Sequence, residues 1–452
     1  MIKFFKVKEI IDYKLDDDIF SNDTQYFFTL LGDRFDWINK KLVGLLEKRF
    51  NRKFKPIHVL QAEFGKYYPK NNYIIINKKL KELRKSNPKI IFIQHDEDSN
   101  REFAESVFIK SIIKKLQKKQ NKIFIMPFTS SGLHFNDPKI ILIGPKPDLV
   151  ERLDNKINQL KIFKELNLPR NKVKIYKKFH EIQKDEINLP CFISAANSSG
   201  GHENRIVFNG VDLERFFSKL GSANKNKEVF IAEYVDNIKH SPNVTALVTN
   251  QKEVKILLLT DQILKSTRHF GNIYPSEVNA EVKQNIFEIT QKLGKYLASN
   301  SFRGLFGCDF IVDKNDKCYI VDLNPRRQGS YLMFHLMAKG DNILDAELKI
   351  ALNENFSQLF SLDIPSELVL AYSKISPNKG CREITEDFHE NEELTPFLSF
   401  EERFISSFHP KNFTFLGDCY GQYLVSGNDY SSTLDRLNRE VAKIVAETTC
   451  GG

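Results

Sequence analysis

The sequence lacks spaced cysteine pairs and long apolar runs. Its six cysteines, among 452 residues, show no C-x-x-C spacing, which argues for a reducing compartment and against a zinc site. No apolar run reaches the roughly 18 residues that a membrane-spanning helix needs, and the first residues lack the apolar core of a secretion signal. These absences lead us to expect a cytoplasmic protein with no membrane partner.

Motifs for dinucleotide binding and for covalent catalysis are also missing. No G-x-G-x-x-G follows a predicted strand, no G-x-S-x-G surrounds a serine, and no cysteine has an evident histidine partner. The formal charge of +9 is spread over the chain, without a basic run that stands out from the helices. This distribution favours small anionic ligands and predicts no nucleic-acid partner.

The length of 452 residues predicts about two to four domains. At the N-terminal end, short β-branched runs alternate with helical patterns, which is typical of a parallel sheet covered by helices. We therefore predict an N-terminal α/β domain at residues 1–150. Its predicted strands are 57–60, 73–76, 89–93, 122–126 and 139–143, and its predicted helices include 33–48 and 102–119.

The most informative stretch is 304–330, GLFGCDFIVDKNDKCYIVDLNPRRQGS. It reads as strands 308–313 and 318–323, joined by the polar turn 314–317. These two strands predict a β-hairpin with one apolar face and one face that carries acidic side chains.

A symmetric hairpin sets Asp309 directly across from Asp322, with Asn324 two residues later on the same face. The same register opposes Phe310 to Val321 on the apolar face. Two facing carboxylates repel each other across roughly 5 Å, whereas a divalent cation between them reverses the sign of that effect. Mg²⁺ is the natural candidate, because it binds carboxylate and amide oxygens together with substrate phosphates.

Pro325 ends the second strand of this hairpin and leaves Arg326 or Arg327 beside the predicted metal. A guanidinium there is suited to holding a phosphate or a carboxylate in two contacts. The alternative is an exposed hairpin whose acids face water. We favour the metal site, because the acids share their face with predicted apolar neighbours and the strand runs directly into Asn-Pro-Arg.

The pattern DF-x10-VDLNPR resembles the metal-binding end of the ATP-grasp superfamily, which includes D-alanine-D-alanine ligase and biotin carboxylase. The resemblance implies that Asp309, Asp322 and Asn324 hold one or two Mg²⁺ ions bridging the phosphates of ATP. It also implies that Arg326 steadies the phosphoryl group or an acyl phosphate. The continuation to Ser330 resembles the branch that joins amino acids or small peptides.

The resemblance implies a domain layout as well. The expected fold class is α/β, with an ATP-grasp domain at 151–355 whose lid subdomain covers about 172–235. The N-terminal α/β domain at 1–150 would precede it, and a small C-terminal α+β unit at 356–452 would follow.

Further positions resemble the nucleotide site of the superfamily. Lys156 falls where relatives have a D-K pair whose lysine touches the phosphates, and loop 198–201 resembles the phosphate loop of the lid. The segment from Glu233 would face adenine, and Asn243 would contact the ribose. The implied nucleotide-binding residues are Lys156, Ser198, Ser199, Gly200, Gly201, Glu233, Tyr234, Val235 and Asn243.

The chain departs from the superfamily at Ser194, where relatives usually have a lysine that contacts the nucleotide. Either Arg205 or Lys156 supplies the missing charge, or ATP binds weakly, or ligase chemistry has been lost. The resemblance also implies a basic residue in the predicted loop 263–272 that stabilises the transferred phosphoryl group, with Arg268 as the candidate and Lys265 as its alternative.

The loop 127–137 of the N-terminal domain is a second candidate ligand-binding segment. It contains Ser130, Ser131 and His134 and follows a predicted strand, where open α/β sheets bind ligands.

These features predict an ATP-dependent ligase that joins a carboxylate to an amine through an acyl phosphate, using ATP and Mg²⁺. Its expected partners are small amino acid or peptide substrates, and a homodimer is possible. The alternatives are an ATP-grasp kinase or carboxylase, and a catalytically silent nucleotide-binding or scaffold protein. Which acid and which amine are joined is left open, because such specificity lies in loops without a readable code.

Overall fold

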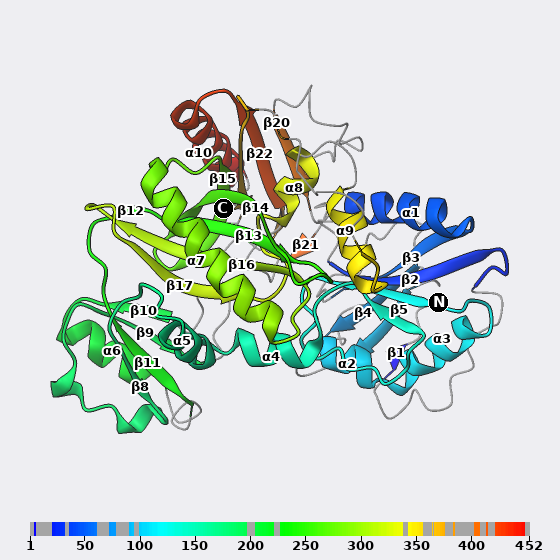
Figure 1. Cartoon of the computed structure of the whole chain (residues 1–452), viewed down its shortest axis with the longest axis horizontal. Helices are drawn as coiled ribbons and strands as arrows, with labels where there is room; N and C mark the ends of the chain where they lie inside the picture. Colours follow the sequence, from blue (N-terminus) through cyan, green and yellow to red (C-terminus); the bar gives the residue numbers. More distant parts are fainter. Residues whose placement is uncertain are drawn as a thin grey trace.

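The computed structural model in Figure 1 describes residues 20–31, 36–60, 99–196, 204–220, 227–337, 342–355, 366–375 and 421–447. It also describes residue 364 and the short strands 4–5, 72–77, 90–94, 383–384, 402–406 and 413–414. Among the described helices, none combines the length and the apolar composition that crossing a bilayer requires. Three main sheets organise the described residues.

The N-terminal domain is built on a seven-stranded sheet in which every described pairing is parallel, as the sequence predicts. Neighbouring residues of the interior strand β2 enter different cores: Phe27 packs with α1 and Phe28 with α3. The sheet is therefore covered on both faces. Its elements are β1 (Phe4–Phe5), β5 (Ile90–Gln94), β4 (Asn72–Asn77), β3 (Lys53–Leu60), β2 (Thr24–Leu30), β6 (Ile123–Pro127), β7 (Ile140–Leu142), α1 (Asp36–Phe50), α2 (Ser99–Glu105) and α3 (Val107–Gln117).

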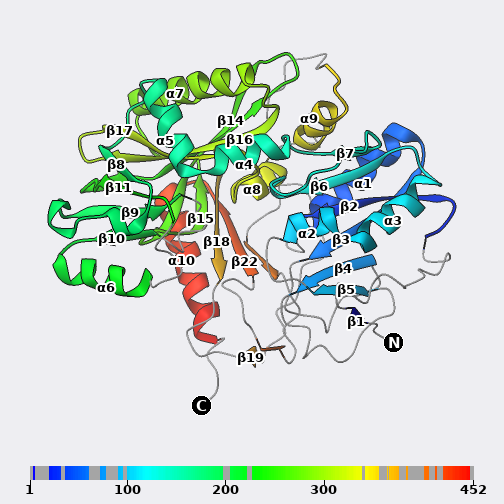
Figure 2. The ribbon, with the colours of Figure 1, turned by 90° about the horizontal axis from the view of Figure 1, so that it is seen from below.

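A pair of short helices leads to a small antiparallel sheet, which lies to one side of the molecule in Figures 1 and 2. This sheet occupies the predicted lid, and α6 packs on it through Leu213 and Phe216. The elements are α4 (Pro147–Asp154), α5 (Lys156–Glu165), β8 (Val173–Tyr176), the 3-10 turns 179–181 and 184–186, β9 (Cys191–Ala195), β10 (Asn204–Val207), α6 (Gly210–Leu220) and β11 (Val229–Glu233).

The largest sheet is antiparallel and carries the predicted metal hairpin near one edge. Helix α7 covers one face, where Ile286 and Leu293 pack against Val244 and Phe310. The described C-terminal strands extend this same sheet. Its elements are β12 (Ile238–His240), β13 (Pro242–Val248), β14 (Val254–Lys265), β15 (Arg268–Tyr274), α7 (Ala280–Ser299), β16 (Gly304–Asp313), β17 (Cys318–Asn324), β18 (Val369–Ile375), β20 (Glu402–Ser406), β22 (Gly421–Gly427) and α10 (Tyr430–Glu447); β19 (Glu383–Ile384) and β21 (Phe413–Thr414) pair separately.

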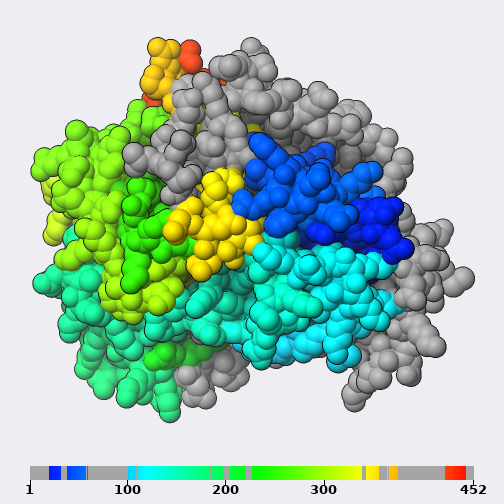
Figure 3. Space-filling view, turned by 45° about the vertical axis from the view of Figure 1, so that its right-hand side comes forward, coloured from blue at the N-terminus to red at the C-terminus, as the bar shows by residue number. Residues whose placement is uncertain are grey.

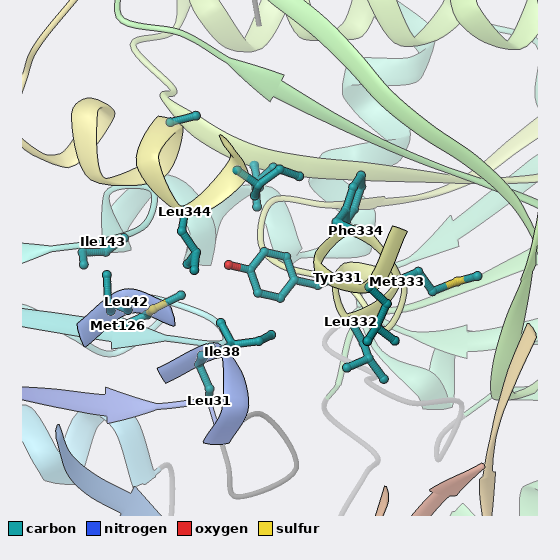
Figure 4. Packing of buried hydrophobic residues seen from close by; sticks show 14 of the residues in the cluster. Leu31, Ile38, Leu42, Met126, Ile143, Tyr331, Leu332, Met333, Phe334 and Leu344 are labelled. Atoms are coloured by element: carbon teal, nitrogen blue, oxygen red, sulfur yellow. The ribbon is translucent and has the colours of Figure 1, made fainter. Parts of the chain in front are cut away.

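Helix α8 (Tyr331–Met337) lies between the N-terminal and central domains, and all of its residues are buried. It packs in one core with Ile38 and Leu42 of α1 and with Met126 of β6, as Figure 4 shows. Helix α9 (Asn342–Ala351) follows and sits between the two domains on the face seen in Figure 3. Apolar packing thus holds the N-terminal domain against the central one.

Arg327 adds a polar connection to this interface, directly after β17. Its side chain is 3% exposed and lies 2.6 Å from Glu347, which also accepts a 2.6 Å hydrogen bond from the Tyr331 hydroxyl. The guanidinium donates to the carbonyl oxygens of Pro127 and, at 2.9 Å, of Ile143, both in the N-terminal domain. Arg327 is therefore a structural residue of the interface.

We predict that Arg327→Met destabilises the protein by about 3–5 kcal/mol, because it leaves Glu347 buried without its positive partner. Arg49→Met is the matched control, since Arg49 pairs with Glu354 at a partly exposed site and should cost less than about 1 kcal/mol. Denaturant unfolding at pH 7 measures both. Equal losses in the two variants would contradict this account.

A second prediction concerns His335 of α8. Burial, followed by the nearby charges of Lys41 and Arg327, lowers the pKa of this side chain well below its usual value. Below about pH 6.5 the unfolded chain therefore binds a proton that the folded protein excludes, so stability falls by up to about 1.4 kcal/mol per pH unit. His335→Gln should show a shallower decline than the wild type between about pH 6.5 and 5; parallel declines would refute the assignment.

Candidate active site

The hairpin of β16 and β17 places the two acids opposite each other. Asp309 pairs directly with Asp322, Cys308 with Leu323, and Asn324 follows on the acidic face opposite the glycine at 307. The facing pair that the sequence predicts is confirmed. Cys308 and Leu323 are fully buried under α7, so the opposite face of the ribbon is turned toward the site.

The register changes immediately beyond the acids. A β-bulge between Asp309 and Phe310 pairs Phe310 with Ile320, whereas a symmetric hairpin would have paired it with Val321. Ile320 therefore enters the core, and Val321 is 38% exposed. The predicted apolar pairing was wrong here, because the extra residue reverses the alternation of side chains along β17. The remaining pairs are Ile311 with Tyr319 and Val312 with Cys318.

The electrostatics of the acidic pair favour a cation. Burial, followed by the charge of Asp322, raises the pKa of Asp309 to about 6, although hydrogen bonds from Asn243 and Asn324 and the charge of Lys156 act in the opposite direction. Asn324 donates to Asp309 across 3.1 Å. Two carboxylates and an amide that converge in this way are a donor set that fits Mg²⁺.

Lys156 reaches the pair from the first turn of α5. Its Nζ lies 2.9 Å from an oxygen of Asp322, and the side chain of Asn155 caps the helix by accepting from the Asn158 backbone. One turn later, Gln159 bonds both backbone groups of Leu323, at 2.7 and 3.0 Å. Helix α5 therefore fixes the free edge of β17 and delivers a lysine to its acid. Gln159 was not predicted from the sequence.

Asn243 lies beside Asp309 on the neighbouring strand β13, at the paired position. Its amide nitrogen donates to Asp309, and its oxygen accepts a 3.0 Å hydrogen bond from the Ser330 hydroxyl. Gln328 contacts Asp309 at 3.4 Å and accepts from Thr245 at 2.9 Å. These buried partners orient the acid, and the sequence reasoning assigned no role to Gln328 or Thr245.

Arg326 is the arginine that faces the site. It is 22% exposed, its Nε is 3.9 Å from Asp154, and its guanidinium carbon lies 5.7 Å from the centre of the Phe128 ring. Phe128 belongs to the loop 127–137 of the N-terminal domain, so that loop lies against Arg326. Burial raises the pKa of Asp154, and Arg326 opposes that shift. Asp154 was not among the predicted site residues.

Comparison with solved structures identifies the fold. Biotin carboxylase from Campylobacter jejuni superposes with a TM-score of 0.64 at 15% identity, covering 91% of this chain and 89% of that one. N5-carboxyaminoimidazole synthetase from Staphylococcus aureus gives 0.60 at 14% identity, with coverages of 93% and 97%. A family model described as "L-aspartate--L-methionine ligase, ATP grasp" matches residues 169–324, which include the acidic pair.

The chain thus has the fold of these enzymes, and its residues 169–324 match an ATP-grasp family model. Among curated relatives, pyruvate carboxylase of Aspergillus terreus is 27% identical over 231 residues, which are 49% of this chain and 19% of that protein. The carbamoyl phosphate synthase large chain of Clostridium acetobutylicum is 21% identical over 255 residues, 53% of this chain and 23% of its own length. The chain thus spans about a fifth of the length of these curated relatives.

The expected adenine segment of the ATP-grasp site follows β11 at the exit from the lid. The Glu233 side chain is exposed, and the backbone oxygen of Glu233 accepts a 2.7 Å hydrogen bond from Asn171. Tyr234 and Val235 are half-buried, and the Tyr234 ring lies 5.5 Å from that of Phe208. The contact of these residues with adenine stays a prediction.

The expected phosphate loop with Ser198, Ser199, Gly200 and Gly201 lies outside the described residues. The strands that flank it are described, and there the buried Ser194 hydroxyl donates to Asn204 over 2.6 Å. Arg205 is exposed and donates to the backbone of Asn204. Of the two residues expected to replace the missing lysine, Lys156 is the one that lies at the acids.

Arg268 is placed differently from the expectation. The predicted loop 263–272 is a β-hairpin, in which Lys265 of β14 pairs with Arg268 of β15 around a two-residue turn. Both side chains are exposed. The sequence predicted a loop because this segment is largely polar. Two of its polar residues, His269 and Asn272, belong to strand β15 and contact each other. A role for Arg268 in phosphoryl transfer stays a prediction.

The second candidate segment, loop 127–137, is tied down by contacts within the N-terminal domain and α4. The Ser130 hydroxyl donates to Pro145 across 2.6 Å. His134 lies 3.2 Å from Asp148 through one ring nitrogen and 2.8 Å from Glu151 through the other. His134 thus lies between the two acids, and one ligand atom from each of the three side chains lies within 4.8 Å of the others.

A substitution at Gly307 can test whether Gln328 supports the site, because a Cβ atom at this position would overlap the Gln328 side chain. We predict that Gly307→Ala displaces Gln328, destabilises the protein by about 1–3 kcal/mol and weakens MgADP binding. Gly44→Ala on α1 is the control, since nothing lies within 4 Å of its added Cβ. Unfolding and MgADP titrations measure the effects. An alanine variant with wild-type MgADP affinity would show that Gln328 does not support the site.

Proposed function

We propose that this protein is an ATP-dependent ligase that joins a carboxylate to an amine and releases ADP and phosphate. The observation that carries the proposal is the facing pair Asp309 and Asp322, with Lys156 2.9 Å from Asp322. Arg326 lies 3.9 Å from Asp154, a carboxyl close enough to Asp322 and Lys156 for their charges to affect its pKa. Acids and cations gathered in this way suit a polyphosphate bound with a metal ion.

Asp309, Asp322 and Asn324 would hold Mg²⁺, which neutralises phosphate charge when it is bound with nucleotide. Lys156 would exchange its contact with Asp322 for a phosphate oxygen. A carboxylate oxygen of the first substrate attacks the γ-phosphorus, the bond to ADP breaks, and Arg326 holds the resulting acyl phosphate. The amine then attacks the carbonyl carbon, phosphate leaves and the nitrogen loses a proton. The chain supplies orientation and charge.

A covalent cysteine intermediate is disfavoured by the surroundings of the described cysteines. Burial raises the pKa of Cys191 to about 11 and that of Cys318 to about 12, and it raises the pKa of Cys308 well above its usual value. Thiols in such surroundings are inert near neutral pH. This supports direct transfer between bound substrates.

Amino acids or small peptides are the proposed substrates, acted on in the cytoplasm without a nucleic-acid or membrane partner. The description of the matching family names L-aspartate and L-methionine, so this is the first pair to test. A carboxylase is the second candidate, favoured by the likeness to biotin carboxylase. In that case bicarbonate would take the place of the amino-acid carboxylate.

The test is a coupled ADP-release screen over pairs of amino acids, with bicarbonate as a separate arm and mass analysis of the product. We expect ADP release to require a carboxylate and an amine together. Asp309→Asn should lower the rate by at least about a hundredfold, whereas Asp185→Asn, an exposed acid of the lid, should not change it.

Three outcomes distinguish the candidates. Release that requires bicarbonate would favour the carboxylase. If the wild type binds MgADP but forms no ADP from ATP with any substrate pair, the result would support a silent nucleotide-binding protein. Full activity in Asp309→Asn would remove the metal site from the proposal.

A further inference from the structure

A row of polar residues crosses the central sheet from the acidic pair to the C-terminal strands. The polar row comprises Asp309, Asn243, Thr260, Asn272 and Tyr372, one each from β16, β13, β14, β15 and β18. Asn243 is paired with both Asp309 and Thr260, and Asn272 is paired with Tyr372. The four residues beyond Asp309 are fully buried or nearly so.

Hydrogen bonds connect the row without a break. The Thr260 hydroxyl donates to the backbone oxygen of Asn243 at 3.4 Å, and the Asn272 amide nitrogen donates to Thr260 at 2.9 Å. The oxygen of Asn272 then accepts from the Tyr372 hydroxyl at 3.1 Å. Since the Asn243 carbonyl can only accept, each donor along the chain is determined in turn.

This direction assigns the tautomer of His269. Its Nε2 lies 2.8 Å from the Asn272 oxygen and must carry a proton, so in the neutral ring Nδ1 is an acceptor. The Nζ of Lys374 is 3.4 Å from that Nδ1 and 3.5 Å from the His269 backbone oxygen. The row thus ends by orienting a half-buried ammonium group on β18.

His269 and Tyr372, at the end of the row, lie beside the loop that carries Arg326. A Cβ atom added at Gly329 would come within 2.8 Å of His269 Cε1 and would also contact Tyr372, so the loop packs directly on the end of the row. Arg326 leaves the same loop toward Phe128 of the N-terminal domain. This loop therefore carries Arg326, which lies 3.9 Å from Asp154, and packs on His269, which contacts Lys374.

An enzyme that joins two amino acids has a use for a second cation. The amine-bearing substrate keeps a carboxylate that does not react, and this carboxylate must be neutralised away from the phosphates while its amine faces the acyl phosphate. We propose that the end of the polar row is the subsite for the amine-bearing substrate, where Lys374, oriented by His269, binds its unreacted carboxylate. This inference rests on the proposed ligase function.

The experiment begins with a thermal-shift screen of the MgADP-loaded protein against the twenty L-amino acids. The best binder is then titrated, together with the analogue in which its α-carboxylate is replaced by an amide. The wild type should bind the free acid more tightly than the amide. Lys374→Met should weaken binding of the acid by about tenfold to a hundredfold and leave the amide unchanged, because only the charged contact is lost. Lys374→Arg should recover part of the loss.

Lys443→Met is the control, because Lys443 is exposed on α10 of the same C-terminal segment. Unchanged MgADP affinity shows that each variant is folded. If Lys374→Met does not fold, His269→Leu is titrated instead and must weaken binding of the acid. Equal binding of acid and amide by the wild type, or wild-type affinity for the acid in Lys374→Met, would overturn the inference.

The two proposals fail separately. Loss of acid binding in Lys374→Met, without ADP release from any substrate pair, would retain the carboxylate subsite and remove the ligase. ADP release from a substrate pair, with wild-type acid binding in Lys374→Met, would retain the ligase and remove the carboxylate subsite.

Discussion

The structure depends on one unfavourable contact, the facing carboxylates of Asp309 and Asp322 on the β16–β17 ribbon. Pairing across an antiparallel ribbon brings such side chains close together, and burial strengthens their repulsion. Lys156 and amide groups from neighbouring strands offset part of it. The helix that brings Lys156, the glutamine that fixes the edge of β17 and the buried hydrogen bonds around Asn243 all serve to hold this pair.

Two consecutive arginines link that pair to the domain arrangement. Arg326 lies 3.9 Å from Asp154, whereas Arg327 enters the interface with the N-terminal domain and pairs with Glu347. The loop between β17 and α8 thus carries a residue of the site and a residue of the domain interface next to each other. Its Gly329 has no side chain, which lets the loop pack closely on Tyr372 and His269.

Features set by local pairing could be predicted from the sequence. The opposition of Asp309 and Asp322 follows from strand alternation, and α7 follows from apolar residues at helical spacing. The bulge at Val321 carries no such signal, because the alternation of side chains along a strand does not reveal where an extra residue is inserted. Which arginine faces the site, and that Asn243 contacts Asp309, depend on long-range register. The polar row could not be found either, since its members are far apart in sequence and polar strands resemble loops.

The most direct test of this account is a crystal structure of the protein with Mn²⁺ and ADP, in which anomalous scattering locates the metal. The account predicts a manganese peak in contact with the carboxylates of Asp309 and Asp322, with Lys156 turned from Asp322 to a phosphate oxygen. Nucleotide bound elsewhere, or bound with no metal at these two acids and Lys156 still paired with Asp322, would contradict it.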